Sequence, residues 1–122
     1  MAKKKVPNPW GKKGCPEHQQ VINEIVEEIG DRDMDAARES IVKTPNGKKR
    51  MRFSDVAAVN RQNLKIEAYY QVGKAKKNGD PIARERQAMD DIEEATGIRP
   101  LFKPYNLVIF AVVLLTTAYL FA

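Results

Sequence analysis

Hydrophobic spacing near the start of the chain predicts an amphipathic helix. Its apolar residues recur every three or four positions, the spacing of one helical face. They are Val21, Ile22, Ile25, Val26 and Ile29. Pro16 suits a first helical turn, and Gly30 stops the pattern. We therefore expect a helix from Pro16 to Gly30, followed by a connector over residues 31–38.

The middle of the chain has the alternation that is typical of strands. The Asn46-Gly47 pair lies between segments 39–44 and 49–59, and such a pair is a strong hairpin signal. After a turn at 60–63, apolar and polar residues alternate over 64–72. Three consecutive antiparallel strands are therefore predicted.

A second helix is predicted after the basic loop 73–80. Asp80 can cap this helix, and Pro81 suits its first position. Its apolar face holds Ile82, Met89 and Ile92, and Gly97 ends it. Residues 98–105 then fit an edge strand or a connection into the tail. The predicted element order is α-β-β-β-α-β, which is the α/β class.

The tail, residues 107–122, contains no side chain that is charged at neutral pH. As a helix it would span about 24 Å, slightly less than a ~30 Å hydrocarbon core. We expect it to be a transmembrane helix, with a buried end of a soluble core as the alternative. Arg99 and Lys103 precede it, so the positive-inside rule places the N-terminal domain in the cytoplasm of a single-pass membrane protein. The expected fold class is an αβββαβ core followed by one C-terminal transmembrane helix.

Length and cysteine content limit the organisation further. A chain of 122 residues suffices for one ordinary domain. We divide it into a basic flexible arm (1–15), an α/β domain (16–105) and the membrane helix (106–122). The lysine-rich start has no apolar stretch behind it, and Cys15 is the single cysteine. We therefore expect no secretory signal and no intramolecular disulfide.

The positive charges of the chain are clustered. The net charge is +5, and the basic clusters are Lys3–Lys5 with Lys12 and Lys13, Lys43 with Lys48, Lys49, Arg50 and Arg52, and Lys74 with Lys76 and Lys77. Such clustering suits a polyanion, either nucleic acid or an anionic membrane surface. A merely solvated surface is the alternative for any one cluster. From the second and third clusters we select Lys49, Arg50, Arg52, Lys76 and Lys77 as nucleic-acid-binding candidates.

Two acidic residues on neighbouring predicted strands are candidates for chemistry. Strand alternation puts Asp55 on the apolar side, where an unpaired carboxylate is costly. Glu67 lies on the next strand, and the two carboxylates could converge on Mg²⁺ or Mn²⁺. Gln71 or Lys74 would then orient a water or neutralise developing charge. The alternative is that both acids form ion pairs with nearby arginines and lysines.

Several short segments of the chain bear on its family. They are Asn8–Gly11, Cys15–Gln19, Arg52–Val56, Tyr70–Lys74, Pro81–Arg86, Ala88–Ile92 and Gly97–Pro100. Together they resemble the nuclease toxin domains of the restriction-endonuclease-like, or PD-(D/E)XK, superfamily. The resemblance covers residues 8–106 and implies metal-dependent hydrolysis of phosphodiesters. In it, Asp55 matches the aspartate of the second strand and Glu67 the acid of the third. The lysine of the family would fall at Tyr69, so its role passes to Gln71 or Lys74 or is absent.

The resemblance also makes His18 a candidate to touch phosphate near a helix N-terminus, with a satisfied buried histidine as the alternative. Arg84 and Arg86 on the second predicted helix could likewise contact phosphate, or could pair with Asp90, four residues beyond Arg86. Neither His18 nor Cys15 has the spaced partners of a zinc site.

The function expected from the sequence is that of a membrane-anchored, metal-dependent nuclease. One alternative is a non-catalytic small subunit that docks on a larger membrane complex through its basic domain and its tail. Another is a membrane-tethered protein that binds nucleic acid without cutting it. An inhibitory protein partner and a homodimer are left open, as is the choice between DNA and RNA.

Overall fold

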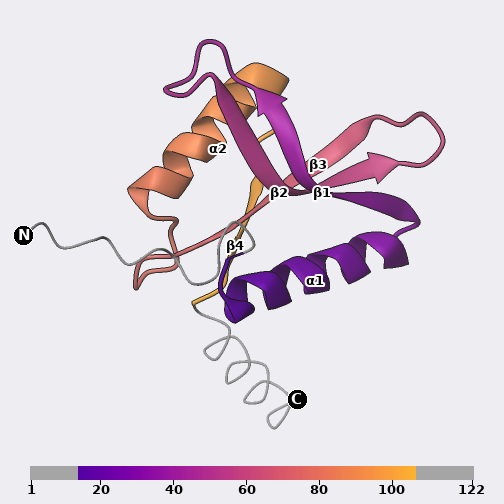
Figure 1. The fold of residues 1–122 in the computed structure, drawn as a ribbon, viewed down its shortest axis with the longest axis horizontal. Helices are drawn as coiled ribbons and strands as arrows, with labels where there is room; N and C mark the ends of the chain where they lie inside the picture. The colour runs from indigo at the N-terminus through magenta and orange to yellow at the C-terminus, as the bar shows by residue number, and fades with distance from the viewer. Residues whose placement is uncertain (1–13, 107–122) are drawn as a thin grey trace, which may run out of the picture.

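The structure is a computed structural model that describes residues 14–106. Its elements are α1 (Pro16–Asp31), β1 (Met34–Lys43), β2 (Met51–Asn60), β3 (Ile66–Gly73), α2 (Ala83–Thr96) and β4 (Leu101–Pro104). The strands form one four-stranded sheet in the order β1-β2-β3-β4 (Figure 1). β2 is antiparallel to both of its neighbours, and β4 is parallel to β3.

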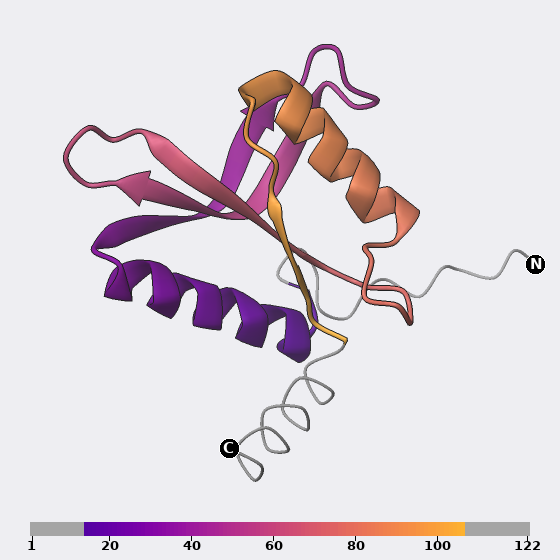
Figure 2. The same cartoon turned by 180° about the vertical axis from the view of Figure 1, so that it is seen from behind.

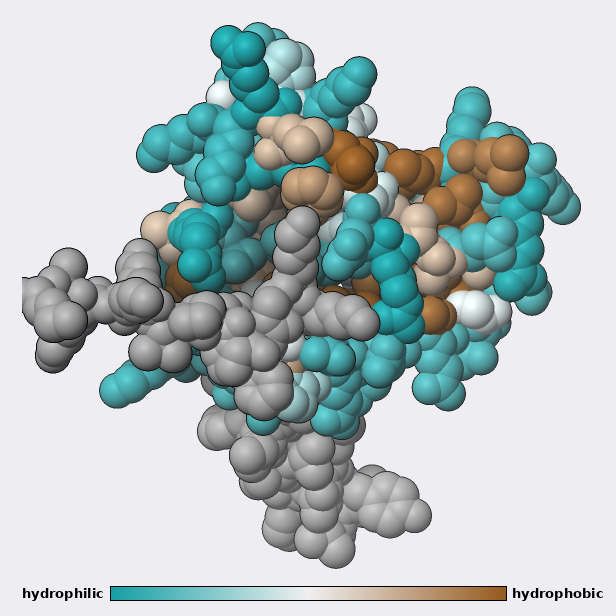
Figure 3. Space-filling model, viewed as in Figure 1, coloured by the Kyte–Doolittle hydropathy of each residue, from teal (hydrophilic) through white to brown (hydrophobic). Residues whose placement is uncertain are grey.

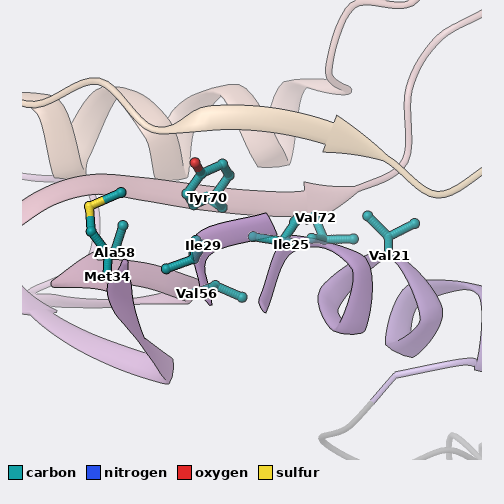
Figure 4. Packing of buried hydrophobic residues seen from close by; sticks show 8 residues of the cluster. All are labelled: Val21, Ile25, Ile29, Met34, Val56, Ala58, Tyr70 and Val72. Atoms are coloured by element: carbon teal, nitrogen blue, oxygen red, sulfur yellow. The ribbon is translucent and has the colours of Figure 1, made fainter. Parts of the chain in front are cut away.

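Helix α1 covers one face of the sheet with the apolar stripe read from the sequence. Val21, Ile25 and Ile29 are buried at intervals of four residues. They pack against side chains from β1, β2 and β3 in the main hydrophobic cluster (Figure 4). The strand residues in this cluster are Met34, Val56, Ala58, Tyr70 and Val72. Burial of this stripe holds α1 across the middle of the sheet.

Helix α2 lies on the opposite face, because it contacts the alternate residues of the same strands. Ile92 packs against Val42, Ala57 and Tyr69 in a second cluster. The helix makes the crossover between β3 and the parallel β4, and Figure 2 shows both from behind. Gly97 ends the helix at φ 77°, a left-handed conformation that favours glycine.

The predicted fold class is corrected by the described residues. They form an α/β fold with two helices and a four-stranded sheet. Over residues 14–106 neither helix combines the length and the apolar character needed to cross a membrane. The segment 107–122, to which the transmembrane helix was assigned, lies outside the described residues, as does most of the arm predicted for residues 1–15.

The connector predicted for residues 31–38 is wrong in its second half. β1 already begins at Met34, and its first rung pairs Met34 with Asn60 of β2. Hydrogen bonding to a long neighbouring strand, rather than alternation of apolar residues, makes this segment extended.

The predicted start of the second helix is also wrong. α2 begins at Ala83, and its N-cap residue Ile82 offers no side-chain hydrogen bond. Pro81 instead forms a bridge with Ala75, and the Asp80 carboxylate accepts a hydrogen bond from Asn78 (3.1 Å). The loop before α2 is therefore held by its own contacts, and the helix begins two residues later than predicted.

The tip of the β1–β2 hairpin is fastened to α2 by a buried ion pair. Arg52 directs Nε and one terminal nitrogen at Oδ2 of Asp91, at 2.9 Å and 2.7 Å. Gln87 Nε2 and the Lys48 backbone N–H donate further hydrogen bonds to the same carboxylate, at 2.9 Å and 3.1 Å. Gly47 is required here, because a Cβ at this position would lie 2.6 Å from Cγ of Asp91.

Strands β2 and β3 separate at Asp55 and form a fork. They pair only between Val59↔Ile66 and Val56↔Tyr70. Before Val56, β2 pairs only with β1, whereas the end of β3 pairs with β4. Figure 1 shows the β1–β2 hairpin leaving the line of β3 at this point. At the fork the Asp55 side chain of β2 stays partly exposed, whereas residues 69–73 of β3 are buried.

Candidate functional site

Asp55 lies where β2 leaves β3, and its carboxylate fills the opening of the fork. Oδ2 accepts a hydrogen bond from the Val72 backbone N–H at 2.7 Å. Oδ1 is 3.6 Å from Nε2 of His18. The Asp55 side chain is 22% exposed, so the carboxylate is largely buried but remains accessible from the surface.

His18 comes to the fork from the first turn of α1. Its Nε2 is 3.2 Å from the Val72 carbonyl oxygen, and because a carbonyl only accepts, Nε2 carries the hydrogen. The ring also packs edge-on against Tyr105 at 5.7 Å. Nδ1 is buried without a hydrogen-bond partner among the described residues. Gly14 lies directly over Nδ1, since a Cβ there would be 2.7 Å away.

Gln71 and Glu85 form the part of the site that comes from β3 and α2. Gln71 Nε2 donates to Glu85 Oε2 at 3.1 Å. The amide oxygen Oε1 of Gln71 is buried and has no partner within residues 14–106. Glu85 packs closely on Gly73, where a Cβ would lie 2.6 Å from its carboxyl carbon. A buried oxygen without a donor is costly, and a ligand that supplies a donor or a cation would satisfy it.

The electrostatic environment favours the protonated form of Asp55. Burial raises its pKa most, the Val72 N–H and then His18 act against that rise, and the charges of Glu85 and Glu39 add to it. The net effect raises the pKa of Asp55 to about 6. A carboxyl that titrates near neutral pH can exchange protons with a substrate or gain from a bound cation.

Two cavities open beside Asp55. One, of about 400 Å³, reaches α1 and is lined by Gln19, Ile22, Asn23, Arg38, Glu39 and Asp55. The other, of about 370 Å³, is lined by Glu39, Phe53, Ser54 and Asp55. Glu39 borders both cavities and has φ 51°, a strained conformation for a residue with a side chain. Such strain is common at functional sites, and here it interrupts the β1–β2 pairing opposite Asp55.

Glu67 does not join Asp55, although the sequence places both on neighbouring strands. An irregularity between Ala58 and Val59 leaves Glu67 without a partner in the β2–β3 register. Its side chain is exposed near the β2–β3 turn, where Oε1 accepts a hydrogen bond from Asn60 (3.0 Å). Asp55 and Glu67 therefore do not form the predicted metal pair.

The fork does not contain the pair of carboxylates that the sequence predicts as metal ligands. Within residues 14–106 no three histidine, cysteine, aspartate or glutamate side chains are grouped closely enough to hold a metal ion. Mg²⁺, however, is commonly bound through one or two carboxylates, with waters and substrate phosphates completing its shell. The Asp55 carboxylate is an oxygen ligand of the right kind, and it lines both cavities.

The remaining predicted residues occupy three environments. Lys74, Lys76 and Lys77 begin the loop that leaves the β3 end of the fork, and their side chains are exposed. Arg84 is exposed beside Glu85, with 3.7 Å between charged atoms. The basic cluster of the β1–β2 hairpin is divided. Lys49 and Arg50 are exposed in the hairpin loop, whereas Arg52 is buried against Asp91.

Sequence reasoning missed Glu85, Glu39 and Tyr105 as members of the site. Glu85 stands inside the segment Pro81–Arg86 that supports the resemblance, and this was an available signal. The left-handed backbone of Glu39 and the contact of Tyr105 with His18 have no local sequence signature.

No family model, curated protein or solved structure matches the chain. The resemblance to the PD-(D/E)XK superfamily stays a prediction made from the sequence.

Proposed function

We propose that this domain is a metal-dependent nuclease that hydrolyses phosphodiester bonds of nucleic acid at the β2–β3 fork. The observation that supports it most strongly is Asp55, a largely buried carboxyl group whose pKa is raised to about 6 and which borders two cavities. Perturbed carboxyl groups in clefts are typical of catalytic sites. The net charge of +5 adds long-range attraction for a polyanion.

Asp55 is the residue that would hold the cation, because its carboxylate offers oxygen atoms and lines both cavities. A bound Mg²⁺ supplies polarisation of the phosphodiester and a lower pKa for a coordinated water. Glu67, the other acid of the predicted pair, does not contribute to cation binding. It lies near the start of β3, where it accepts a hydrogen bond from Asn60.

The surrounding residues position Asp55 and attract the substrate. The Val72 N–H fixes Oδ2, and His18 faces Oδ1 while its own ring is held by the Val72 carbonyl. Lys74 and Arg84 are exposed at the end of β3 and the start of α2, where positive charge favours binding of the phosphate backbone. Glu85 accepts a hydrogen bond from the side-chain amide nitrogen of Gln71 and so keeps Gln71 in place.

A cleavage assay with matched variants tests the proposal. The full chain is incubated with single-stranded and duplex DNA and RNA of one sequence, with Mg²⁺ or Mn²⁺ and separately with a chelator. We expect cleavage only with the cation, and at least about a 100-fold lower rate for Asp55→Asn. Glu67→Gln is the control, because it removes an exposed carboxylate away from the fork and should keep the wild-type rate.

Two results would contradict the proposal. One is the absence of cation-dependent cleavage of all four substrates. The other is an Asp55→Asn variant that cleaves as fast as the wild type, which would place the activity elsewhere in the chain or in a contaminant.

A further inference from the structure

The outer face of the β1–β2 hairpin exposes large hydrophobic side chains. Ile41 and Phe53 are directly paired across the strands and are 61% and 54% exposed. Lys43 pairs with Met51, which is 47% exposed. In Figure 3 hydrophobic surface crosses the upper part of the molecule, where Figure 1 places this hairpin. We call Ile41, Lys43, Met51 and Phe53 the hairpin face.

The hairpin face is not the face that the fold uses for its own packing. Val42 and Arg52, which alternate with these residues, are buried against the α2 side. The ion pair with Asp91 and the hydrogen bonds around it anchor the hairpin from behind. The exposed hydrophobic residues of the hairpin face therefore belong to a hairpin that its contacts with α2 hold in place.

This face leads directly to the proposed reacting centre. Phe53 and Asp55 line the same cavity of about 370 Å³. Farther along the hairpin, a hollow of about 590 Å³ is lined by Lys43, Pro45, Arg50 and Met51. A ligand that follows the hairpin from its tip thus passes a basic stretch, then an aromatic ring, and then the Asp55 carboxyl.

The charge of the hairpin selects a class of partner. Lys43, Lys49 and Arg50 are exposed and form no ion pair within residues 14–106. Basic side chains beside an exposed aromatic ring are the combination that binds single-stranded nucleic acid, since phosphates meet the cations and a base stacks on the ring. In a duplex the base faces are covered by their neighbours, so this contact requires an unpaired base.

We infer that the hairpin face binds single-stranded nucleic acid, with an unpaired base stacked on Phe53 and phosphates on Lys43 and Arg50. This inference rests on the proposed function, for which it names the substrate class. It makes the β1–β2 hairpin the element that guides a single strand into the fork.

Binding measured without divalent cation tests the inference apart from cleavage. The full chain is titrated into fluorescently labelled single-stranded and duplex oligonucleotides of one sequence, in chelator, and anisotropy is recorded. We expect the single strand to bind more tightly. Phe53→Ala should weaken its binding by roughly 5- to 100-fold, as expected for loss of one stacked base, whereas Phe53→Tyr should retain it.

Matched variants separate stacking from general hydrophobicity and from charge. Leu64→Ala removes another exposed hydrophobic side chain, 74% exposed in the β2–β3 turn, and should bind as the wild type does. Lys43→Ala should reduce the slope of log K against log salt concentration by about 0.7 for a single strand. Thermal melting of each variant checks that it is folded.

The outcomes also distinguish this inference from the proposed nuclease. Equal binding by Phe53→Ala and Leu64→Ala, tighter binding of the duplex, or no binding of nucleic acid would overturn the hairpin face as the binding surface. If cation-dependent cleavage by the wild type persisted in that case, the nuclease would stand without it. Conversely, Phe53-dependent binding with no cleavage would support the surface and reject the nuclease.

Discussion

Asp91 is buried and Asp55 is largely buried, but the two aspartates have opposite environments. Asp91 receives hydrogen bonds from Arg52, Gln87 and the Lys48 N–H. Burial alone would raise its pKa, but these hydrogen bonds and the charge of Arg52 outweigh burial and lower it. Asp55 has one short hydrogen bond, a histidine at 3.6 Å and two glutamates nearby, and its pKa rises to about 6.

The difference separates a structural site from the proposed functional one. Both oxygens of the Asp91 carboxylate accept hydrogen bonds and the residue is buried, so it fastens the hairpin to α2 and is closed to a ligand. Beside Asp55, by contrast, His18 Nδ1 is buried without a partner in the described part of the chain, as is Gln71 Oε1 next to Glu85. Unsatisfied polar atoms lower stability and are kept where a ligand completes them.

Removing the Asp91 carboxylate should have the largest effect on the free energy of unfolding. Asp91→Ala leaves the Arg52 guanidinium buried without its partner, which typically costs about 3–5 kcal/mol. Denaturant unfolding should show this loss in the free energy of unfolding. Asp90→Ala is the control, because Asp90 is about half exposed and pairs with Arg99 at the surface, where the cost is about 1 kcal/mol or less. Similar losses in both variants would contradict a structural role for the buried pair.

Removing the charge of the Asp55 carboxyl should have the opposite effect on stability. The pKa of Asp55 is higher in the folded state than its ordinary value of 3.8, so the native state holds the proton more tightly than the unfolded state. Its contribution to stability is therefore greatest below about pH 4 and declines as the pH rises to about 6. Asp55→Asn should raise the free energy of unfolding by about 1–3 kcal/mol at pH 8 and leave it nearly unchanged at pH 3. Thermal melts over this range measure the effect, and a variant less stable than the wild type at pH 8 would contradict it.

Charges around Asp55 should shift its titration by smaller amounts. His18 lowers the pKa of Asp55, and Glu39 raises it. Since the ionised form would hold the cation, His18→Gln should move the acidic limb of the pH–rate profile to higher pH, and Glu39→Gln should move it to lower pH. Shifts in the same direction for both variants would show that the limb reports another group.

The sequence predicts the local elements well where periodicity is strong. The stripe of α1 and the hairpin at Asn46-Gly47 both occur. β1 was placed too late, because residues 34–38 gain their extended form from pairing with β2 rather than from their own pattern. Boundaries set by tertiary contacts have little local signal.

The candidate site was predicted in part. Asp55 and His18 meet at the fork, where both contact the backbone of Val72, whereas the side chain of Gln71 contacts Glu85 of α2. The pairing with Glu67 failed, because a β-irregularity and the separation of β2 from β3 change which residues are neighbours. Arg52 was assigned to nucleic acid but faces α2, and strand alternation alone does not say which face a later helix will cover.

Carboxyl-group NMR titration of the full chain, with and without Mg²⁺, tests the contrast between the two aspartates most directly. Without the cation we expect Asp55 to titrate with a pKa of about 6 and Asp91 with a pKa below its usual range. Mg²⁺ should lower the pKa of Asp55, because a bound cation favours the ionised form, and should leave Asp91 unchanged. An Asp55 that titrates at its ordinary value, or that does not respond to Mg²⁺ while Asp91 does, would contradict the assignment of the fork as the functional site.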